Sequence, residues 1–303
     1  MSRLLIKASN PMCLLQDAGR FGVRHLGVTQ GGAADWLSMT WANWLLGNAP
    51  GAAVVEITLG GMSLIAQSDC TLALAGADLA ASVDGKALKP WRCIELKKGQ
   101  TLSFTQPLLG ARAYLAAPGG FVAPQVLGSS ATVVREQLGG PDGFGRALAI
   151  GDELNYTAEP SALRDIPLAQ HPGFTANPLL DVVLGAQIGA FSGQSTFDAF
   201  NQPWTLDSRA DRMGIRLQGP ALEYQGAPMI SEGIPLGAIQ VPPDGQPIVL
   251  LNDRQTIGGY PRLGALTPLA LARLAQCVPG ETVYLRPVTQ DAAQRQHQAF
   301  MQR

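Results

Sequence analysis

Short apolar segments separated by turn residues recur along most of this chain. Segments of four to six residues rich in aliphatic, β-branched and aromatic side chains lie at residues 54–59, 70–75, 100–104, 112–117 and 248–251. These residue types favour strands. The pair Asp84-Gly85 is typical of a two-residue hairpin turn. A regular succession of short strands and turns predicts a mainly β protein built from barrels or sandwiches.

Three segments have helical signals. Asp35 is a suitable N-cap for a helix over residues 36–46. Thr267 followed by Pro268 predicts a helix that ends near Gln276. The polar segment 290–303 predicts a surface helix or a frayed end. The apolar residues of the first segment are predicted to share one helical face: Leu37, Trp41, Trp44 and Leu45.

The order of motifs in the first half recurs in the second. A strand is followed by Gly-Gly-aromatic, then Leu-Gly, then Gly-acidic, first over residues 113–153 and again over residues 248–281. This order predicts two related barrels, with chance recurrence of common turn residues as the alternative. We place the two domains at residues 1–160 and 175–303, joined by a proline-rich linker over residues 158–177.

Composition excludes several classes of protein. A chain of 303 residues with 46% hydrophobic and 15% charged residues is long enough for two cores and is ordinary for a globular protein. A net charge of −1 gives no reason to expect nucleic acid or a membrane surface as a partner. No apolar run is long enough for a signal peptide or a membrane span, which favours the cytoplasm. The four cysteines and three histidines lack disulfide, metal-ligand or catalytic-triad spacing.

The last third of the chain concentrates rigid turn residues and charged side chains, at residues 208–217, 231–247 and 251–261. Polar groups held on a rigid scaffold are typical of a small-molecule site. All five lysines precede residue 100 and no phosphate-binding loop motif occurs, so arginines must supply the positive charge here. The predicted catalytic residues are Asp211, Arg212, Arg216, Glu232, Asp253 and Arg254. The predicted substrate-binding residues are Gln240, Gln255, Thr256, Gly258, Gly259 and Tyr260, and no metal is predicted.

The charged residues among these have a functional and a structural interpretation. Arg212 or Arg216 is suited to grip a carboxylate or phosphoryl group, with Asp211 fixing it or moving a proton. The alternative is an internal ion pair that holds a turn. Glu232 and Gln240 are suited to the N–H and C=O groups of a small amide, and are otherwise exposed turn residues.

The second group lies around a Gly-Gly pair. Gly258 and Gly259 are predicted to let backbone amides face an anion in a nest. Tyr260 is expected to stack on the ligand or to donate a hydrogen bond.

From about residue 3 to residue 288 the chain resembles the biotin-dependent carboxyltransferase-like family, which includes the C subunit of bacterial 5-oxoprolinases and a module of urea carboxylases. The resemblance is carried by Leu15-Gln-Asp-Ala-Gly-Arg-Phe-Gly22, by Ser208-Arg-Ala-Asp-Arg-Met-Gly214 and by Asp253-Arg-Gln-Thr-Ile-Gly-Gly-Tyr-Pro261. It implies a pair of cyclophilin-like β-barrel domains with a few helices, working beside a partner protein.

Three functions are compatible with this resemblance. In the first, the chain works in direct contact with the B subunit of a 5-oxoprolinase, together with the A subunit, in ATP-dependent cleavage of 5-oxo-L-proline to L-glutamate, with ATP bound by or shared with the partners. In the second, it transfers a carboxyl group from carboxybiotin to urea or a similar amide; because no lysine lies in a biotinyl setting, a separate carrier is then required. In the third, it is a non-enzymatic regulator that controls a kinase through its partner protein.

Overall fold

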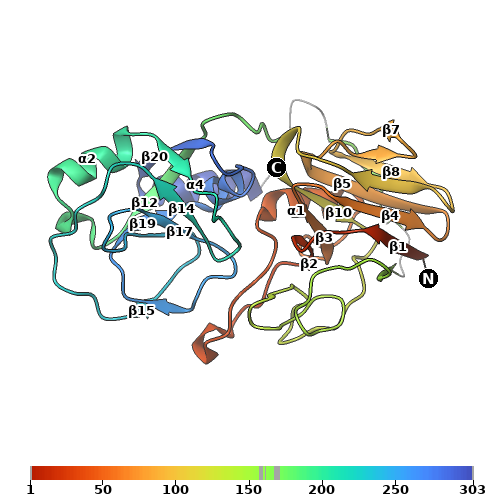
Figure 1. Ribbon diagram of the computed structural model, residues 1–303, viewed down its shortest axis with the longest axis horizontal. Helices are drawn as coiled ribbons and strands as arrows, with labels where there is room; N and C mark the ends of the chain where they lie inside the picture. The colour runs from red at the N-terminus through yellow and green to blue at the C-terminus, as the bar shows by residue number, and fades with distance from the viewer. Residues whose placement is uncertain (1, 157–159, 161, 167–170, 302–303) are drawn as a thin grey trace. The chain divides into compact units, whose positions relative to one another are not determined.

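The computed structural model describes residues 2–156, 160, 162–166 and 171–301 (Figure 1). The chain divides into two compact units, Met1–Val23 with Gln30–Gly173 and Arg24–Thr29 with Phe174–Arg303. The short segment Arg24–Thr29, which we call the arm, is therefore part of the second unit although it lies early in the sequence. Within the predicted linker, residues 158, 159, 161 and 167–170 lie outside the described residues.

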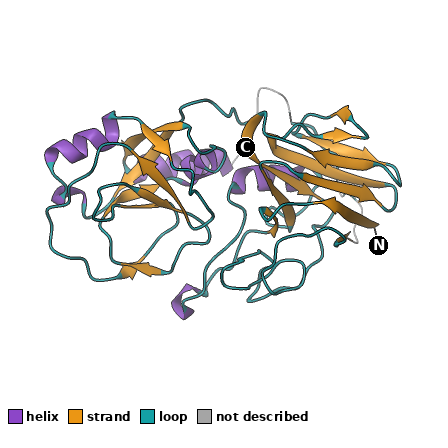
Figure 2. Ribbon diagram, viewed as in Figure 1, coloured by secondary structure: helices purple, strands orange, loops and turns teal. Residues whose placement is uncertain are grey.

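The first unit is built from two antiparallel sheets (Figure 2). One has the strand order β11 (Glu153–Tyr156), β1 (Ser2–Ala8), β4 (Met62–Ala66), β9 (Thr101–Phe104), β6 (Ser82–Val83) and β7 (Lys86–Ala87). The other has the order β2 (Cys13–Gln16), β3 (Val54–Thr58), β10 (Leu109–Ala116), β5 (Cys70–Asp78) and β8 (Arg92–Leu96). Their inward residues, such as Leu4, Ile57 and Leu115, form one buried core.

The hairpin predicted at the Asp-Gly pair is confirmed. Strands β6 and β7 pair through Val83 and Lys86, and the two residues between them have positive φ angles of 47° at Asp84 and 81° at Gly85. Positive φ at both central positions is the geometry that tight hairpins require.

Helix α1 (Trp36–Leu45) begins where it was predicted, because a carboxylate oxygen of Asp35 accepts a hydrogen bond from the Ser38 backbone N–H at 3.0 Å. The predicted apolar face is only partly buried: Leu45 is buried, Leu37 and Trp41 are half-buried, and Trp44 is exposed. The Arg164 guanidinium lies 4.7 Å from the Trp44 ring centroid. The other buried residues of the helix are Ser38, Met39, Ala42 and Asn43. The amide of the polar Asn43 donates hydrogen bonds to the carbonyl oxygens of Pro50 and Ala52, which follow the helix, and these bonds allow its burial.

A long loop of the first unit, residues 117–152, is held by two buried polar side chains near the N-terminus. Asp17 accepts hydrogen bonds from the Ser129 hydroxyl at 2.6 Å and the Ser130 backbone N–H at 2.7 Å. The fully buried Arg20 guanidinium donates to the carbonyl oxygens of Val126 and Ala131. A charged group that satisfies several backbone carbonyls fixes the course of a loop that has little regular structure.

The second unit contains a closed barrel. Its strand order is β12 (Leu179–Leu184), β19 (Arg262–Leu266), β16 (Ala238–Gln240), β17 (Ile248–Leu250), β14 (Gly214–Gln218), β13 (Trp204–Leu206) and β20 (Thr282–Val288). A parallel pairing of β12 with β20 closes the ring, and all other pairs are antiparallel. The barrel encloses a second core around Trp204, Ile239 and Leu285. A separate two-stranded ribbon pairs β15 (Glu232–Gly233) with β18 (Ile257–Gly258).

The helices of the second unit are short. They are the 3-10 turns η1 (Arg24–Leu26) and η3 (Ile188–Ala190) and the helices α2 (Gly193–Asn201), α3 (Pro268–Leu274) and α4 (Gln290–Met301). Helix α3 has the predicted cap, since the Thr267 hydroxyl accepts from the Ala270 backbone N–H. Helix α4 has no buried residue and is a surface helix. Helix α2 was not predicted; its Ser192 N-cap was the available signal.

The prediction of a mainly β protein is confirmed. The closed barrel is found in the second unit, whereas the described strands of the first unit form two separate sheets.

Candidate functional site

Two of the predicted segments are brought together by the barrel. Strands β14 and β17 pair at Gly214 and Leu250, so the turn before β14 meets the turn after β17. The backbone N–H of Asp253 donates to the Arg212 carbonyl oxygen at 2.9 Å. The Arg212 Nε and Nη2 atoms donate to the two Asp253 carboxylate oxygens at 3.0 and 3.1 Å. The pair is a two-pronged ion pair whose side chains are 15% and 8% exposed.

Two further predicted residues are engaged in local contacts. One carboxylate oxygen of the exposed Asp211 accepts from the backbone N–H groups of Met213 and Gly214, at 2.8 and 3.0 Å, and this stabilises the turn. Arg216 forms an ion pair with Asp244, whose side chain is half exposed. The backbone N–H of Gln246 and the Arg216 guanidinium lower the pKa of Asp244 below its usual value. None of these contacts requires a ligand.

Arg254 is buried inside the second unit. Its Nε donates to the Ile234 carbonyl oxygen at 3.2 Å and its Nη1 to the Leu251 carbonyl oxygen at 3.1 Å. Burial, and secondarily the positive charge of Arg24, lower the pKa of Arg254 to about 9. Burial of a guanidinium costs free energy, and a buried ionisable group with a shifted pKa is a candidate functional residue.

A polar cluster lies around the β15–β18 ribbon. Glu232 forms an ion pair with Arg262 and accepts a hydrogen bond from Gln187 Nε2 at 3.2 Å. Glu232 pairs with Gly258 across the ribbon, and a Cβ at Gly258 would lie only 3.0 Å from Gln240 Nε2. Glu232, Gln240 and Gly258 therefore lie close together.

Two buried amide atoms in this cluster have unused hydrogen-bonding capacity. Gln240 is 3% exposed, and its Nε2 donor has no partner among the described residues. The Oε1 acceptor of Gln187 is likewise buried and without a partner in the described part of the chain. A buried polar atom without a partner costs free energy, which a ligand can recover. One donor and one acceptor are what the C=O and N–H of an amide need.

The predicted anion nest is wrong at Gly258. Gly258 belongs to strand β18, whereas a nest requires alternating turn conformations. Gly258 instead allows close packing, because a Cβ at this position would lie 2.6 Å from Ile234 Cδ1. Gln255 and Tyr260 have exposed side chains, and the Thr256 carbonyl oxygen accepts from the Ile234 N–H. Gly259 is half-buried beside Ser231.

Sequence reasoning missed three members of this region. Arg262 follows the Gly-Gly-Tyr-Pro motif directly, and its charge was a usable signal. Gln187 lies in a turn with no distinguishing pattern. Arg24 comes from the arm, and its Nη2 donates to the carbonyl oxygens of Ile234 at 2.7 Å and Thr256 at 3.0 Å. These partners are more than 200 positions away in the chain, so no local pattern connects them.

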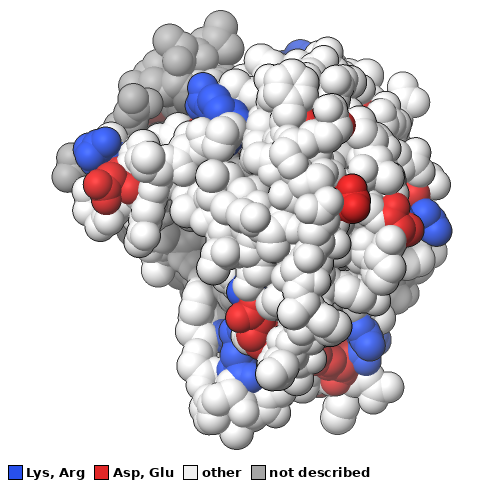
Figure 3. All heavy atoms as spheres, turned by 90° about the vertical axis from the view of Figure 1, so that its left-hand side faces the viewer, with Lys and Arg blue, Asp and Glu red and all other residues white. Residues whose placement is uncertain are grey.

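One face of the molecule shows few charged side chains. Figure 3 shows acidic and basic side chains as small, separate groups on a largely uncharged face. In the part of the chain that the structure describes, no group of three or more His, Cys, Asp or Glu side chains is placed to hold a metal ion. No helix among the described residues is both long and apolar enough to cross a membrane.

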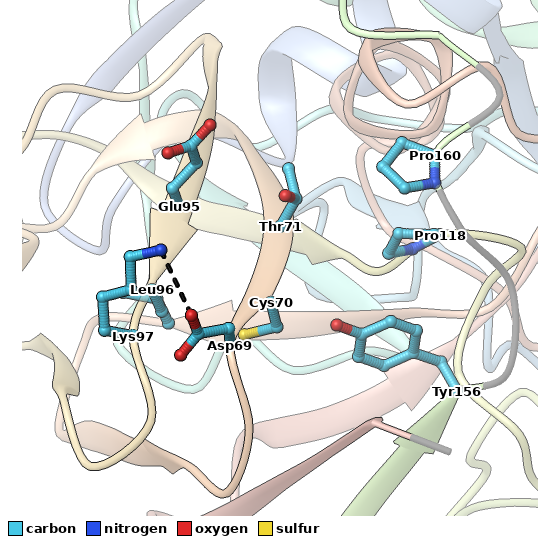
Figure 4. A pocket seen from close by; sticks show the side chains of 9 residues that line it. All are labelled: Asp69, Cys70, Thr71, Glu95, Leu96, Lys97, Pro118, Tyr156 and Pro160. Atoms are coloured by element: carbon cyan, nitrogen blue, oxygen red, sulfur yellow. Dashed lines mark hydrogen bonds and ion pairs between the residues drawn. The ribbon is translucent and has the colours of Figure 1, made fainter.

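A pocket lies elsewhere, in the first unit (Figure 4). It has a volume of about 270 Å³, and the ion pair between Asp69 and Lys97, 3.1 Å apart, borders it. Cys70 and Tyr156 also line it, and burial raises the pKa of the Cys70 thiol. None of the residues that line this pocket was predicted as a site residue.

Barrel and polar cluster together define a β-barrel protein with a candidate small-molecule site rich in arginine and amide groups. The family described as "Carboxyltransferase domain, subdomain A and B" matches residues 26–287, and the chain belongs to this family. The chain is 39% identical to the 5-oxoprolinase C subunit of Haemophilus influenzae over 92% of this chain and 89% of that protein. It is 36% identical to the 5-oxoprolinase C subunit of Escherichia coli over 89% of this chain and 86% of that protein.

The similarity to urea-metabolising proteins is weaker in sequence but extends over the whole fold. The urea amidolyase of Saccharomyces cerevisiae is 26% identical over 92% of this chain and 16% of that protein. The crystal structure of the Kluyveromyces lactis urea carboxylase matches 98% of this chain and 28% of that chain, with a TM-score of 0.92 and 26% identity. The chain therefore spans little more than a quarter of that solved structure.

Proposed function

We propose that this chain is the C subunit of an ATP-dependent 5-oxoprolinase. With the A and B subunits, in the cytoplasm, it would cleave the cyclic amide of 5-oxo-L-proline to give L-glutamate. The observation that carries the proposal is the 39% identity to a 5-oxoprolinase C subunit over nearly the full length of both proteins. The identity to urea amidolyase is 26%, and that protein is several times longer.

The polar cluster supports a lactam as ligand. In this proposal Gln240 Nε2 donates to the lactam oxygen, and Gln187 Oε1 accepts from the lactam N–H. Glu232 is held by Arg262 beside them. In this proposal the region is supported by the Arg212–Asp253 ion pair and by the turn residue Asp211. The other predicted residues lie around it: Arg216, Gln255, Thr256, Gly259 and Tyr260. A hydrogen bond that strengthens as charge builds on the lactam oxygen favours its cleavage.

ATP is assigned to the partner proteins. A lactam is a poor electrophile, and phosphorylation of its oxygen would activate it. In the second unit the guanidiniums of Arg212, Arg216 and Arg262 already pair with carboxylates, and this unit has no lysine. These residues do not fit a nucleoside triphosphate, so the chain supplies one part of a shared site. A shared site requires direct contact with another subunit, and we propose the B subunit for that contact.

The finer details of the fold belong to the same proposal. Both units are proposed to be cyclophilin-like, with domains at residues 1–160 and 175–303. The support is the recurrence of the motif order in the two halves.

Co-purification tests the function. The complex of this chain with its A and B subunits is expected to convert 5-oxoproline to glutamate with ATP consumption, whereas the chain alone should be inactive. Production of glutamate and ADP is measured together. Turnover by the lone chain would contradict the shared site, and a complex without 5-oxoproline turnover would contradict the function.

The second candidate is carboxyl transfer from carboxybiotin to urea or a similar amide. The TM-score of 0.92 to urea carboxylase favours it, because the same fold is present there. The same complex, given urea and carboxybiotin on a carrier, would then carboxylate urea and leave 5-oxoproline unchanged.

Gly258 provides a test of the polar cluster. Gly258→Ala places a methyl group 3.0 Å from Gln240 Nε2, so the amide must move away from the ligand. We expect turnover of the complex to fall about tenfold, equivalent to ~1.4 kcal/mol, and the free energy of unfolding to fall by about 1 to 3 kcal/mol, because the buried Ile234 side chain must also shift.

Gly233→Ala, in the paired strand β15, is the matched control. Gly233 is exposed and a Cβ there would meet nothing within 4 Å. Turnover of this variant should change less than about twofold. Equal activity of the two variants would remove Gln240 from the substrate site.

A further inference from the structure

The arm carries a positive charge into the second unit. Arg24, at the start of η1, donates through Nη2 to the carbonyl oxygens of Ile234 and Thr256. The Thr29 hydroxyl, at the other end of the arm, donates to the Arg254 carbonyl oxygen at 3.4 Å. The arm is thereby attached at both ends to the segments that hold the proposed site.

Arg24 and Arg254 converge on one acceptor. The Ile234 carbonyl oxygen accepts from Arg24 Nη2 at 2.7 Å and from Arg254 Nε at 3.2 Å. Two guanidinium groups on the same oxygen repel one another, and burial increases that repulsion. Burial lowers the pKa of Arg24, and the charge of Arg24 contributes to the lowered pKa of Arg254.

Arg24 also has an unused donor. Its Nη1 atom is buried and has no hydrogen-bond partner among the described residues. The two acceptors of its Nη2 are neutral carbonyls, and each already accepts a second hydrogen bond within the unit. An anion at this position would both satisfy Nη1 and offset the repulsion between the two guanidiniums.

We propose that Arg24, together with Arg254, binds an oxyanion of the substrate beside the amide-binding pair Gln187 and Gln240. The inference rests on the proposed function, in which the oxyanion is either the carboxylate of 5-oxoproline or the phosphoryl group placed on its lactam oxygen. The arm is open to solvent next to Arg24. His25, Leu26 and Gly27 are exposed, and a Cβ at Gly27 would meet nothing within 4 Å.

Arg24→Met in the assembled complex tests this inference. We expect the KM for 5-oxoproline to rise at least about tenfold, as for loss of a charged hydrogen bond. The inhibition constant of pyrrolidinone, the same lactam without a carboxylate, should change less than about twofold. Inorganic phosphate as inhibitor distinguishes the second source, because its binding weakens if the anion is a phosphoryl group. Arg24→Lys keeps the charge but loses the two-pronged geometry of the guanidinium. Its KM and inhibition constants should lie between those of the wild type and of Arg24→Met.

Arg273→Met, at an exposed arginine of α3, is the matched control and should leave all constants unchanged. The inference is overturned if the wild-type complex is active and neither the 5-oxoproline nor the phosphate constant changes in Arg24→Met. It is equally overturned if the binding of all three molecules weakens equally, since that result means Arg24 only supports the fold. Failure of the proposed function is distinguishable, because the wild-type complex then does not turn over 5-oxoproline. The arginine side-chain NMR signals of the full-length chain, titrated with 5-oxoproline and with phosphate, then still report whether Arg24 binds an oxyanion.

Discussion

Replacement of Asp253 by alanine is expected to lower the free energy of unfolding of the second unit by about 3 kcal/mol or more. The substitution removes both oxygens that hold the Arg212 fork and leaves a guanidinium that is only 15% exposed. A buried charge that loses its partner costs far more than the pair contributed when intact. Because Arg212 then leaves its position, turnover of the complex should also fall about a hundredfold.

Fluorescence of Trp204 during urea unfolding measures this effect, since Trp204 is the single tryptophan of the second unit. Asp244→Ala is the matched control. It breaks the pair with Arg216, but the Asp244 side chain is 52% exposed, so the loss should stay within about 1 kcal/mol.

A double-variant cycle separates the pair from its surroundings. Arg212→Met combined with Asp253→Ala should be less destabilising than the sum of the single changes, by about 2 kcal/mol. Additive effects would show that Arg212 and Asp253 act independently and that their ion pair does not stabilise the second unit.

Gly139→Ala is expected to destabilise the first unit by about 4 kcal/mol, the upper range for a single substitution. Gly139 has a φ of +68°, and a Cβ there would lie 2.7 Å from the Ala131 carbonyl carbon and 2.5 Å from Arg20 Nη2. Neither neighbour can give way, because Arg20 is fully buried and itself holds the Ala131 carbonyl oxygen. Urea unfolding followed by fluorescence of the four tryptophans of this unit gives the measurement.

Gly128→Ala, in the same loop, is its control. Gly128 has a φ of +79°, but a Cβ there would meet nothing within 4 Å. Only the backbone strain of a left-handed conformation remains, and its cost is about 1 kcal/mol. If both alanine variants lose the same stability, the close packing around Arg20 does not hold this loop.

The local elements were largely readable from the sequence. The caps at Asp35 and Thr267 and the hairpin at Asp84-Gly85 all lie where they were predicted, because each depends on contacts within a few residues. The short apolar segments also became strands, because their residue types favour extended backbone, although their pairing partners lie far away in the chain. The buried face of α1 was only partly readable, since burial of Asn43 depends on carbonyls seven and nine positions away.

The candidate site likewise has some features that the sequence predicted and others that only the tertiary structure shows. The sequence by itself predicted a small-molecule site in three glycine- and proline-rich segments and determined that arginine must supply the positive charge there, because composition and spacing suffice for that. Only the tertiary structure decided that Arg212 is paired with Asp253, that Gly258 lies in a strand, and that Gln187 and Gln240 hold unused amide atoms. It alone brought Arg24 to Ile234, across more than 200 residues. Barrel closure sets such contacts between segments distant in the chain, and no local pattern of residues records which segments will meet.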